Sequence, residues 1–162
     1  MTDFRTGIGY DSHRLAEGLP LRLGGVDIDY PLGCVAHSDG DAVIHALCDA
    51  LFGAAGMDDI GTHFPDNDPR FKGADSRKLL TETVRMLQDD GWRIHNADVT
   101  IILEKPKLAP YKQSIKETLA RILQIPVTAL AVKAKTNEQM DAVGRGEGVA
   151  AIAAVSIIRA EN

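Results

Sequence analysis

Apolar residues recur every three or four positions after Asp41, and this spacing predicts an amphipathic helix. The stripe stops at residues 53–56, where two glycines are typical of a helix end. Its members are Val43, Ile44, Leu47, Cys48, Leu51 and Phe52. One face of this helix is therefore expected to be buried.

Two later segments show the same helical spacing. Asp75 or Ser76 can cap a second helix that runs to about Asp90, with Gly91 at its end. A third helix is expected after Pro110. The expected buried stripes are Leu79, Leu80, Val84 and Leu87 in the second helix, and Ile115, Leu119, Ile122 and Leu123 in the third.

Segments of strand-like composition, most of them rich in β-branched or aromatic residues, predict strands before and between these helices. The expected strands are Phe4–Tyr10, Leu21–Leu23, Val26–Tyr30, Ala97–Leu103, Leu130–Lys135 and Val149–Ile158. This order of elements fits an α+β fold, a two-layer mixed β-sheet with helices packed on one face. No repeat or linker divides the chain, so residues 1–162 are expected to form one domain.

The composition narrows the possible functions. The 162 residues carry a formal charge of −5, which argues against a duplex nucleic-acid binder, and no run of Lys or Arg suits a membrane surface. The two cysteines, Cys34 and Cys48, form neither a disulfide framework nor a Cys-x-x-Cys metal site. With no signal-like N-terminus and no apolar run long enough to span a bilayer, we expect a cytoplasmic protein.

Two further features of the composition bear on the expected fold and function. Eight of the 16 Asp residues lie between His37 and Asp75, a concentration that indicates either a cap-rich loop region or a metal-binding site. The chain also has 20 Ala residues and few aromatics, so its core is expected to be aliphatic and closely packed. A partner subunit could cover part of the Ala-rich surface.

A candidate metal site combines a strand segment with the first helix. Asp11 and His13 are two residues apart, so in extended backbone their side chains point to the same side. His45 lies one helical turn beyond Asp41. Two imidazoles and one carboxylate are the composition of a catalytic zinc site with an open fourth position. The grouping requires the strand and the helix to meet in space, which spacing alone does not establish.

Other interpretations of these residues stay open. An Asp-x-His pair is more often a turn or a surface hydrogen bond than a metal site. Ser38 and Asp41 resemble a capping box at the start of the first helix. His63 and His95 are competing ligands, although both are expected at the surface.

Two other segments carry candidate chemistry. Residues 57–73 show little periodicity and are expected to form a turn and an exposed loop; its Asp59, Asp66 and Asp68 could accept hydrogen bonds from hydroxyls or simply form an Asp-rich turn. The run 133–138 and the Gly-Arg-Gly-Glu-Gly at 144–148 suit phosphate, with Glu138 suited to a divalent cation, or could be a tight turn before the last strand. No Walker-type motif occurs.

Taken together, these segments resemble the 2-C-methyl-D-erythritol 2,4-cyclodiphosphate synthase family over nearly the whole chain. The motifs that carry the resemblance are Gly-Tyr-Asp-Ser-His at 9–13, Ala-His-Ser-Asp-Gly-Asp at 36–41, Asp-Ile-Gly at 59–61, Phe-Pro-Asp-Asn-Asp-Pro-Arg-Phe-Lys-Gly-Ala-Asp-Ser at 64–76, and Gly-Arg-Gly-Glu-Gly at 144–148. Their order and spacing agree with the family as well.

The resemblance implies a homotrimer with active sites between subunits. It implies that 4-diphosphocytidyl-2-C-methyl-D-erythritol 2-phosphate is converted to the cyclic diphosphate with release of CMP. Asp11, His13 and His45 match zinc ligands, and Glu138 matches the ligand of a second cation, Mg²⁺ or Mn²⁺. The positions assigned to transition-state stabilisation are His37 and Thr136.

The resemblance also implies a set of substrate-binding positions. Asp11, His13, His37 and Ser38 lie near the phosphates, and the segments expected to hold the methylerythritol part supply Asp59, Ile60, Gly61, Phe64, Pro65, Asp66, Asn67 and Asp68. The expected cytidine diphosphate pocket and its neighbours comprise Leu103, Pro106, Lys107, Leu108, Ala109, Lys135, Thr136, Asn137, Glu138, Ala142 and Arg145.

Two positions depart from the family pattern. Lys135 stands where a Thr is usual and could add a phosphate contact, and Ala142 replaces a bulky side chain bordering a cavity on the trimer axis, where isoprenoid diphosphates are expected to bind in relatives.

Two other functions stay open: a zinc-dependent phosphohydrolase, which would give a linear product, and a non-catalytic trimeric binder of isoprenoid diphosphates.

Overall fold

The computed structural model describes residues 3–65 and 67–160. Among these described residues, five strands form one mixed sheet in the order β4-β1-β7-β5-β6, in which only β5 and β6 are parallel. These strands are β1 (Phe4–Glu17), β4 (Leu32–Cys34), β5 (Trp92–Ile102), β6 (Leu130–Lys135) and β7 (Gly148–Arg159). A separate two-stranded ribbon pairs β2 (Leu21–Leu23) with β3 (Val26–Ile28).

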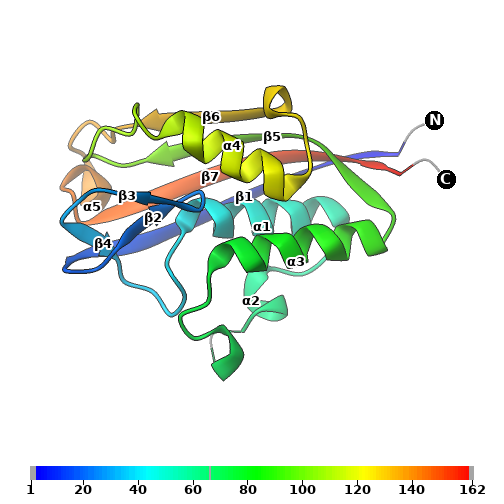
Figure 1. Cartoon of the computed structure of the whole chain (residues 1–162), viewed down its shortest axis with the longest axis horizontal. Coiled ribbons are helices and arrows are strands. Elements are labelled where there is room, and N and C mark those ends of the chain that lie inside the picture. Colours follow the sequence, from blue (N-terminus) through cyan, green and yellow to red (C-terminus); the bar gives the residue numbers. More distant parts are fainter. Residues whose placement is uncertain (1–2, 66, 161–162) are drawn as a thin grey trace.

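The helices cover one face of the sheet, as Figure 1 shows. α1 (Ala42–Ala55) packs directly on β1 and β7, α3 (Ser76–Asp89) packs against α1, and α4 (Lys112–Leu123) packs against α3 and β6. α2 (Ile60–His63) and α5 (Asp141–Gly144) are single turns, and two 3₁₀ turns span Pro69–Phe71 and Val127–Ala129. The structure therefore confirms the expected mixed α+β architecture.

The three long helices and most strands agree with the sequence-based prediction, but several boundaries differ. β1 extends to Glu17, so Asp11 lies within the strand rather than after it. β5 begins at Trp92, before the predicted start at Ala97, because residues 92–96 continue to pair with β7. β4 and α5 were not expected, since each is too short to show a periodic pattern.

α1 is almost entirely buried because the sheet covers one side of it and α3 another. Gly7 and Gly9 of β1 make the contact with the sheet close: a Cβ at Gly9 would lie 1.9 Å from the carbonyl oxygen of Ala46, and one at Gly7 would lie 2.0 Å from that of Ala50. Only glycine allows such an approach. Strand and helix backbones therefore touch, next to Asp11 and His13.

The start of α1 is fixed by Asp41, not by Ser38. The buried Asp41 carboxylate accepts hydrogen bonds from the backbone N–H groups of Ile44 at 3.1 Å, Gly24 at 2.8 Å and Gly25 at 2.6 Å. The expected capping role of Ser38 is wrong, because its hydroxyl is directed at His45 instead. Asp41 thus ties the helix start to the β2–β3 turn.

The face of the sheet opposite the helices is uncovered in the isolated chain. On β1, Ile8 is 73% exposed, Tyr10 60% and Phe4 55%. Large apolar side chains alternate outward along this strand because neighbouring positions, including Gly7 and Gly9, face α1. Among the described residues, no helix combines the length and hydrophobicity that a membrane crossing requires.

Candidate active site

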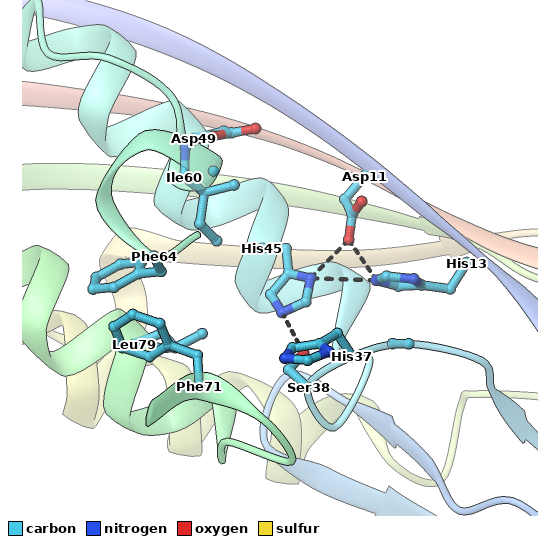
Figure 2. Close-up of a pocket in the computed structure, with 12 residues that line it drawn as sticks. Asp11, His13, His37, Ser38, His45, Asp49, Ile60, Phe64, Phe71 and Leu79 are labelled. Carbon is cyan, nitrogen blue, oxygen red and sulfur yellow. Dashed lines mark hydrogen bonds and ion pairs between the residues drawn. The ribbon is translucent and has the colours of Figure 1, made fainter. Parts of the chain in front are cut away.

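A cavity opens beside the first turns of α1, between the sheet and the loop that precedes α3 (Figure 2). Its polar lining comes from β1, the segment before α1, and α1 itself, and its apolar lining from the 60–71 loop and α3. The lining residues are Asp11, His13, Ala36, His37, Ser38, His45, Asp49, Ile60, Gly61, Phe64, Phe71 and Leu79.

Asp11, His13 and His45 converge at one wall of this cavity, and we call them the metal cluster. Asp11 Oδ2 lies 2.8 Å from His13 Nε2 and 3.0 Å from His45 Nδ1. The two ring nitrogens are 3.3 Å apart. The close packing of α1 on Gly7 and Gly9 brings the three side chains together, so the predicted meeting of strand and helix is confirmed.

These distances fit a tetrahedral cation. Ligands at 2.0–2.1 Å from a zinc ion stand about 3.3 Å apart in ideal tetrahedral geometry, so a slight widening of the cluster would accommodate the ion. The side chains of Asp11, His13 and His45 are 25%, 17% and 13% exposed, which leaves the cluster open on the cavity side. The donor set and its open side therefore suit a divalent metal that also meets a ligand.

Electrostatics within the metal cluster favour the charged carboxylate. Burial alone would raise the pKa of Asp11, but hydrogen bonds from His13 and His45 and their positive charge lower it to about 2. Burial would lower the pKa of His45, but the hydrogen bond to Asp11 and its charge raise it instead. The cluster is therefore polarised around an ionised Asp11, as a cation-binding site requires.

His37 and Ser38 lie on the same cavity, next to His45 (Figure 2). Ser38 Oγ is 3.2 Å from His45 Nε2 and accepts a hydrogen bond from Gly40 N. His37 is exposed at the rim, so its ring is free to meet a ligand. The structure thus brings these two predicted residues beside the metal cluster.

The 59–71 segment forms the opposite wall. Ile60, Gly61 and Phe64 line the cavity, and the Phe64 ring packs edge-on against Phe71 with centroids 5.5 Å apart. Asp59 does not line it; its carboxylate caps α2 by accepting from Thr62 N at 3.0 Å. The expected open loop therefore has two short helical turns.

The remaining predicted residues of this segment differ in their surroundings. Asp68 caps the turn at Pro69–Phe71 and pairs with Arg70 at 2.6 Å, so it has a structural role as well. Pro65 is half-buried and Asn67 is exposed. Asp66 lies outside the described residues.

Asp49 is a cavity residue that the sequence-based reasoning missed. It is four residues beyond His45, on the same helix face, and its Oδ1 accepts a hydrogen bond from Ile60 N at 2.7 Å. This bond attaches the far wall of the cavity to α1. The i, i+4 spacing from His45 is the signal that could have identified it.

The two competing histidines are not part of the metal cluster. His95 is exposed, as expected. His63 is half-buried and stacks on Phe52 with ring centroids 4.2 Å apart, so its expected surface position is wrong. The reason is that α2 folds back onto α1 and carries His63 with it.

The residues predicted to bind cytidine diphosphate lie at a different edge of the sheet. Residues 103–109 follow β5 and residues 135–138 end β6 or follow it; we call these two runs the nucleotide segments. Parallel pairing of β5 and β6 brings them together, with Leu103 N donating to Lys135 O at 2.9 Å and Asn137 N to Glu104 Oε2 at 3.1 Å. Thr136 Oγ1 donates to Glu138 Oε1 at 3.0 Å.

Members of the nucleotide segments differ in exposure. Leu103 and Leu108 are only 4% exposed, so their side chains belong to the core and they can offer a ligand little but backbone. Pro106, Lys107 and Ala109 flank Leu108 nearby in the same connection. Thr136, Asn137 and Glu138 are accessible or half-buried.

The nucleotide segments are separated from the metal cluster within one chain. Sheet register aligns Asp11 with Ala151, Ala151 with Ile101, and Ile101 with Ala134. Three strand spacings of about 4.8 Å place β6 about 14 Å from β1. No nucleotide-segment residue lines the cavity beside the metal cluster, so the structure does not bring Thr136 and Glu138 to His37 in a single chain.

Ala142 and Arg145 lie in the turn that enters β7. Ala142 lines a shallow hollow with Tyr10 and Ser12 of β1, whereas Arg145 faces another hollow and pairs with Glu147 at 2.8 Å. The backbone before this turn is unusual: φ is +51° at Glu138, +60° at Gln139 and +54° at Asp141. Non-glycine residues in the left-handed region are uncommon and often lie at ligand sites.

Comparisons with known proteins agree with this geometry. The model of the YgbB family matches residues 4–158. Two curated proteins named 2-C-methyl-D-erythritol 2,4-cyclodiphosphate synthase, from Burkholderia mallei (strain SAVP1) and Burkholderia pseudomallei (strain K96243), are each 52% identical over 157 residues, covering 97% of this chain and 97% of their own.

Solved structures show the same fold. A 2C-methyl-D-erythritol-2,4-cyclodiphosphate synthase in a form with bound CDP has a TM-score of 0.87 and 42% identity, covering 93% of this chain and 98% of its own. The bifunctional IspDF of Campylobacter jejuni has a TM-score of 0.94 and 38% identity, covering 98% of this chain and 43% of the longer IspDF chain. The chain belongs to the YgbB family.

Proposed function

We propose that this chain is a 2-C-methyl-D-erythritol 2,4-cyclodiphosphate synthase. It converts 4-diphosphocytidyl-2-C-methyl-D-erythritol 2-phosphate into the cyclic diphosphate and CMP, a phosphorus–oxygen lyase reaction of the non-mevalonate isoprenoid pathway. The observation that carries the proposal is the open metal cluster on a cavity lined by His37 and Ser38. Curated relatives that match almost the whole chain bear the name of this activity.

The reaction joins two anionic groups of one molecule. A 2-phosphate oxygen attacks the β-phosphorus, a new P–O bond forms, and the bond from that phosphorus to the oxygen of the α-phosphate breaks, so CMP leaves with the electron pair. No oxidant, reductant or protein nucleophile is needed. Because the attack is intramolecular, holding the flexible chain in a bent conformation supplies much of the rate enhancement.

Asp11, His13 and His45 would hold Zn²⁺, which when bound offsets the charge of the phosphoryl oxygens and polarises the phosphorus. Glu138 would hold the second cation, Mg²⁺ or Mn²⁺. A single accessible carboxylate suits such an ion, because Mg²⁺ is commonly bound by one or two carboxylates together with waters and substrate phosphates.

The chain's own residues position the substrate. The exposed ring of His37 and the hydroxyl of Ser38 would contact phosphate oxygens beside the metal cluster, and Thr136 would do so from the nucleotide side. Ile60, Gly61 and Phe64, which line the cavity, would enclose the methylerythritol part. Hydroxyl contacts from the 59–68 run would be made in addition to the capping roles of Asp59 and Asp68. The apolar wall formed with Phe71 would help to exclude water from the reacting phosphates.

We also propose that residues 1–162 act as one catalytic domain and assemble as a homotrimer with shared active sites. Two features support this. The metal cluster and the nucleotide segments of one chain are about three strand spacings apart, so a second copy must bring its nucleotide segments to the cavity. The exposed Ile8 and Tyr10 on the open sheet face give copies an apolar surface to bury.

A product analysis tests the proposed function. ³¹P NMR of purified protein with Zn²⁺, Mg²⁺ and the cytidine diphosphate substrate should show CMP and a cyclic diphosphate in equal amounts. A linear bisphosphate with CMP would instead identify a metal-dependent phosphohydrolase. Binding of isoprenoid diphosphates without any turnover would identify a non-catalytic binder.

A further inference from the structure

His45 presents its two ring nitrogens to different surroundings. Nδ1 faces Asp11 and His13, whereas Nε2 lies 3.0 Å from Ser76 Oγ and 3.2 Å from Ser38 Oγ. A neutral imidazole carries a hydrogen on one nitrogen and a lone pair on the other, and only the lone pair can bind a metal. Asp11 can accept a hydrogen from Nδ1, and the neighbours of Nε2 can accept one from Nε2. The Nδ1 lone pair is available to a metal only when Nε2 carries the hydrogen of the neutral ring, so an acceptor at Nε2 favours the metal-binding tautomer.

Ser76 is the closer neighbour, and its own hydrogen is already committed. The Ser76 hydroxyl donates a hydrogen bond to Asp39 Oδ1, and Ser76 N donates to Asp39 Oδ2 at 3.0 Å. A carboxylate can only accept, so Ser76 must be the donor in this pair. Its oxygen is left with lone pairs, which can accept the Nε2 hydrogen of His45.

The Asp39 carboxylate also accepts hydrogen bonds from two groups other than Ser76. Arg22 Nη1 donates to its Oδ2 at 3.4 Å, and Asp41 N donates to its Oδ1 at 3.3 Å. The backbones are also tied, since Asp39 N donates to Ala74 O at 3.2 Å. Ser76 is fully buried, so no water competes for its hydroxyl.

We propose that Asp39 and Ser76 are positioning residues that set the tautomer of His45 for metal binding. The donor direction runs from His45 Nε2 to Ser76 and from Ser76 to Asp39, which leaves the Nδ1 lone pair directed at the metal cluster. The same arrangement leaves the Ser38 hydroxyl free for a substrate phosphate. The inference rests on the metal site of the proposed function but concerns residues outside it.

Zn²⁺ titration of the full-length protein against a chromogenic chelator tests the proposal. Ser76→Ala should lower the Zn²⁺ affinity about 10–100-fold, the usual effect of losing a hydrogen-bond partner of a ligating His. Asp39→Asn should weaken it similarly, because the Asn amide can donate to Ser76 and reverse its hydroxyl. In a Ser76→Ala background, Asp39→Asn should have no further effect on affinity.

Two controls separate positioning from a loss of fold. Ser114→Ala removes the same atoms from an exposed site on α4 and should leave the Zn²⁺ affinity unchanged. ¹⁵N NMR of the zinc-loaded protein should show a slowly exchanging hydrogen on His45 Nε2 that exchanges faster in Ser76→Ala. Circular dichroism of each variant should show the helix content of the wild type.

The outcomes distinguish this inference from the proposed function. Wild-type protein that binds no Zn²⁺ would overturn the proposed metal site. Wild-type binding with an unchanged affinity in Ser76→Ala would overturn only the roles of Ser76 and Asp39. Independent losses that multiply in the double variant would also contradict them, because a single chain of donors requires that the effects overlap.

Discussion

The metal cluster and the nucleotide segments differ in how the fold supports them. Asp11, His13 and His45 lie within a strand and a helix whose backbones touch at Gly9, and their side chains are mostly buried. The nucleotide segments lie at strand ends and continue into a run with left-handed backbone at three non-glycine residues. Under the proposed function, one chain therefore contains a closely packed half for the metal and an accessible half for the nucleotide that does not reach it.

The difference indicates a division of labour. Metal ligands need fixed distances, which packed secondary structure provides. Nucleotide contacts made largely by backbone atoms can come from loops. The surface that faces these loops must then supply the remaining contacts. Because the nucleotide segments do not reach the cavity of their own chain, they need another copy of the chain to face them. Variants in one half should therefore leave the other half unaffected.

The largest effect is expected from the metal cluster. Asp11→Asn replaces the charged ligand by an amide, so bound Zn²⁺ should be lost and cyclisation should slow about 10³-fold, equivalent to about 4 kcal/mol of transition-state stabilisation. Elemental analysis and turnover measurements check this. Asp29→Asn, at an exposed residue that does not line the cavity, should alter neither. Full zinc content in Asp11→Asn would contradict the ligand assignment.

The backbone contact between β1 and α1, which supports the metal cluster, can be disrupted by substituting Gly9. Gly9→Ala would force α1 away from β1, because the new Cβ would meet the Ala46 carbonyl, and should reduce the free energy of unfolding by about 3 kcal/mol. Gly53→Ala on the same helix has open space around it and should raise that free energy by up to about 1 kcal/mol. Denaturant unfolding compares them; equal stability of Gly9→Ala and wild type would refute the close-contact argument.

A change in the nucleotide segments should leave zinc binding intact. Glu138→Gln weakens a hard-cation ligand, so the Mg²⁺ concentration for half-maximal rate should rise about 10-fold, equivalent to about 1.4 kcal/mol, while zinc content stays at the wild-type value. Glu117→Gln on the exposed side of α4 is the matched control. If Glu138→Gln lost zinc instead, the two halves would not be independent.

A smaller effect is expected where the cavity wall joins α1. Asp49→Ala removes the acceptor of the Ile60 N–H and should raise KM about 5–10-fold, in line with about 1 kcal/mol for one hydrogen bond, with less change in kcat. Asp49→Asn keeps an acceptor oxygen and should stay near the wild type. Similar KM values for the Ala variant and the wild type would show that this tether does not position the wall.

Much of the fold and half of the site could be predicted from the sequence. The apolar stripe from Val43 to Phe52 is local, so the helix and its buried face follow from it. The alternation Gly7, Gly9, Asp11, His13 on one strand face also carries information, since two glycines followed by two ligands indicate where a helix can approach. That alternation could have strengthened the predicted link between Asp11 and His45.

Features that depend on strand order could not be predicted. The sequence around Asp11 and Thr136 does not show that two strands, β7 and β5, lie between β1, which contains Asp11, and β6, which ends just before Thr136. The separation of the two halves is therefore visible only in the folded sheet. The sequence predicts Ser76 only as a helix-start residue, because its contact with His45 joins positions 31 apart in the sequence. The sequence predicts a surface position for His63, because the packing of α2 back onto α1 leaves no periodic signal.

The central claim, that each chain carries two halves of different active sites, is tested most directly by subunit complementation. The Asp11→Asn and Thr136→Ala proteins, each expected to have little activity alone, would be unfolded and refolded together. Native mass spectrometry of tagged chains would verify mixed trimers. Random mixing should restore about a quarter of the wild-type rate, because one pairing in four unites an intact metal cluster with intact nucleotide segments from its neighbour. Verified mixed trimers with no recovered activity would contradict the account.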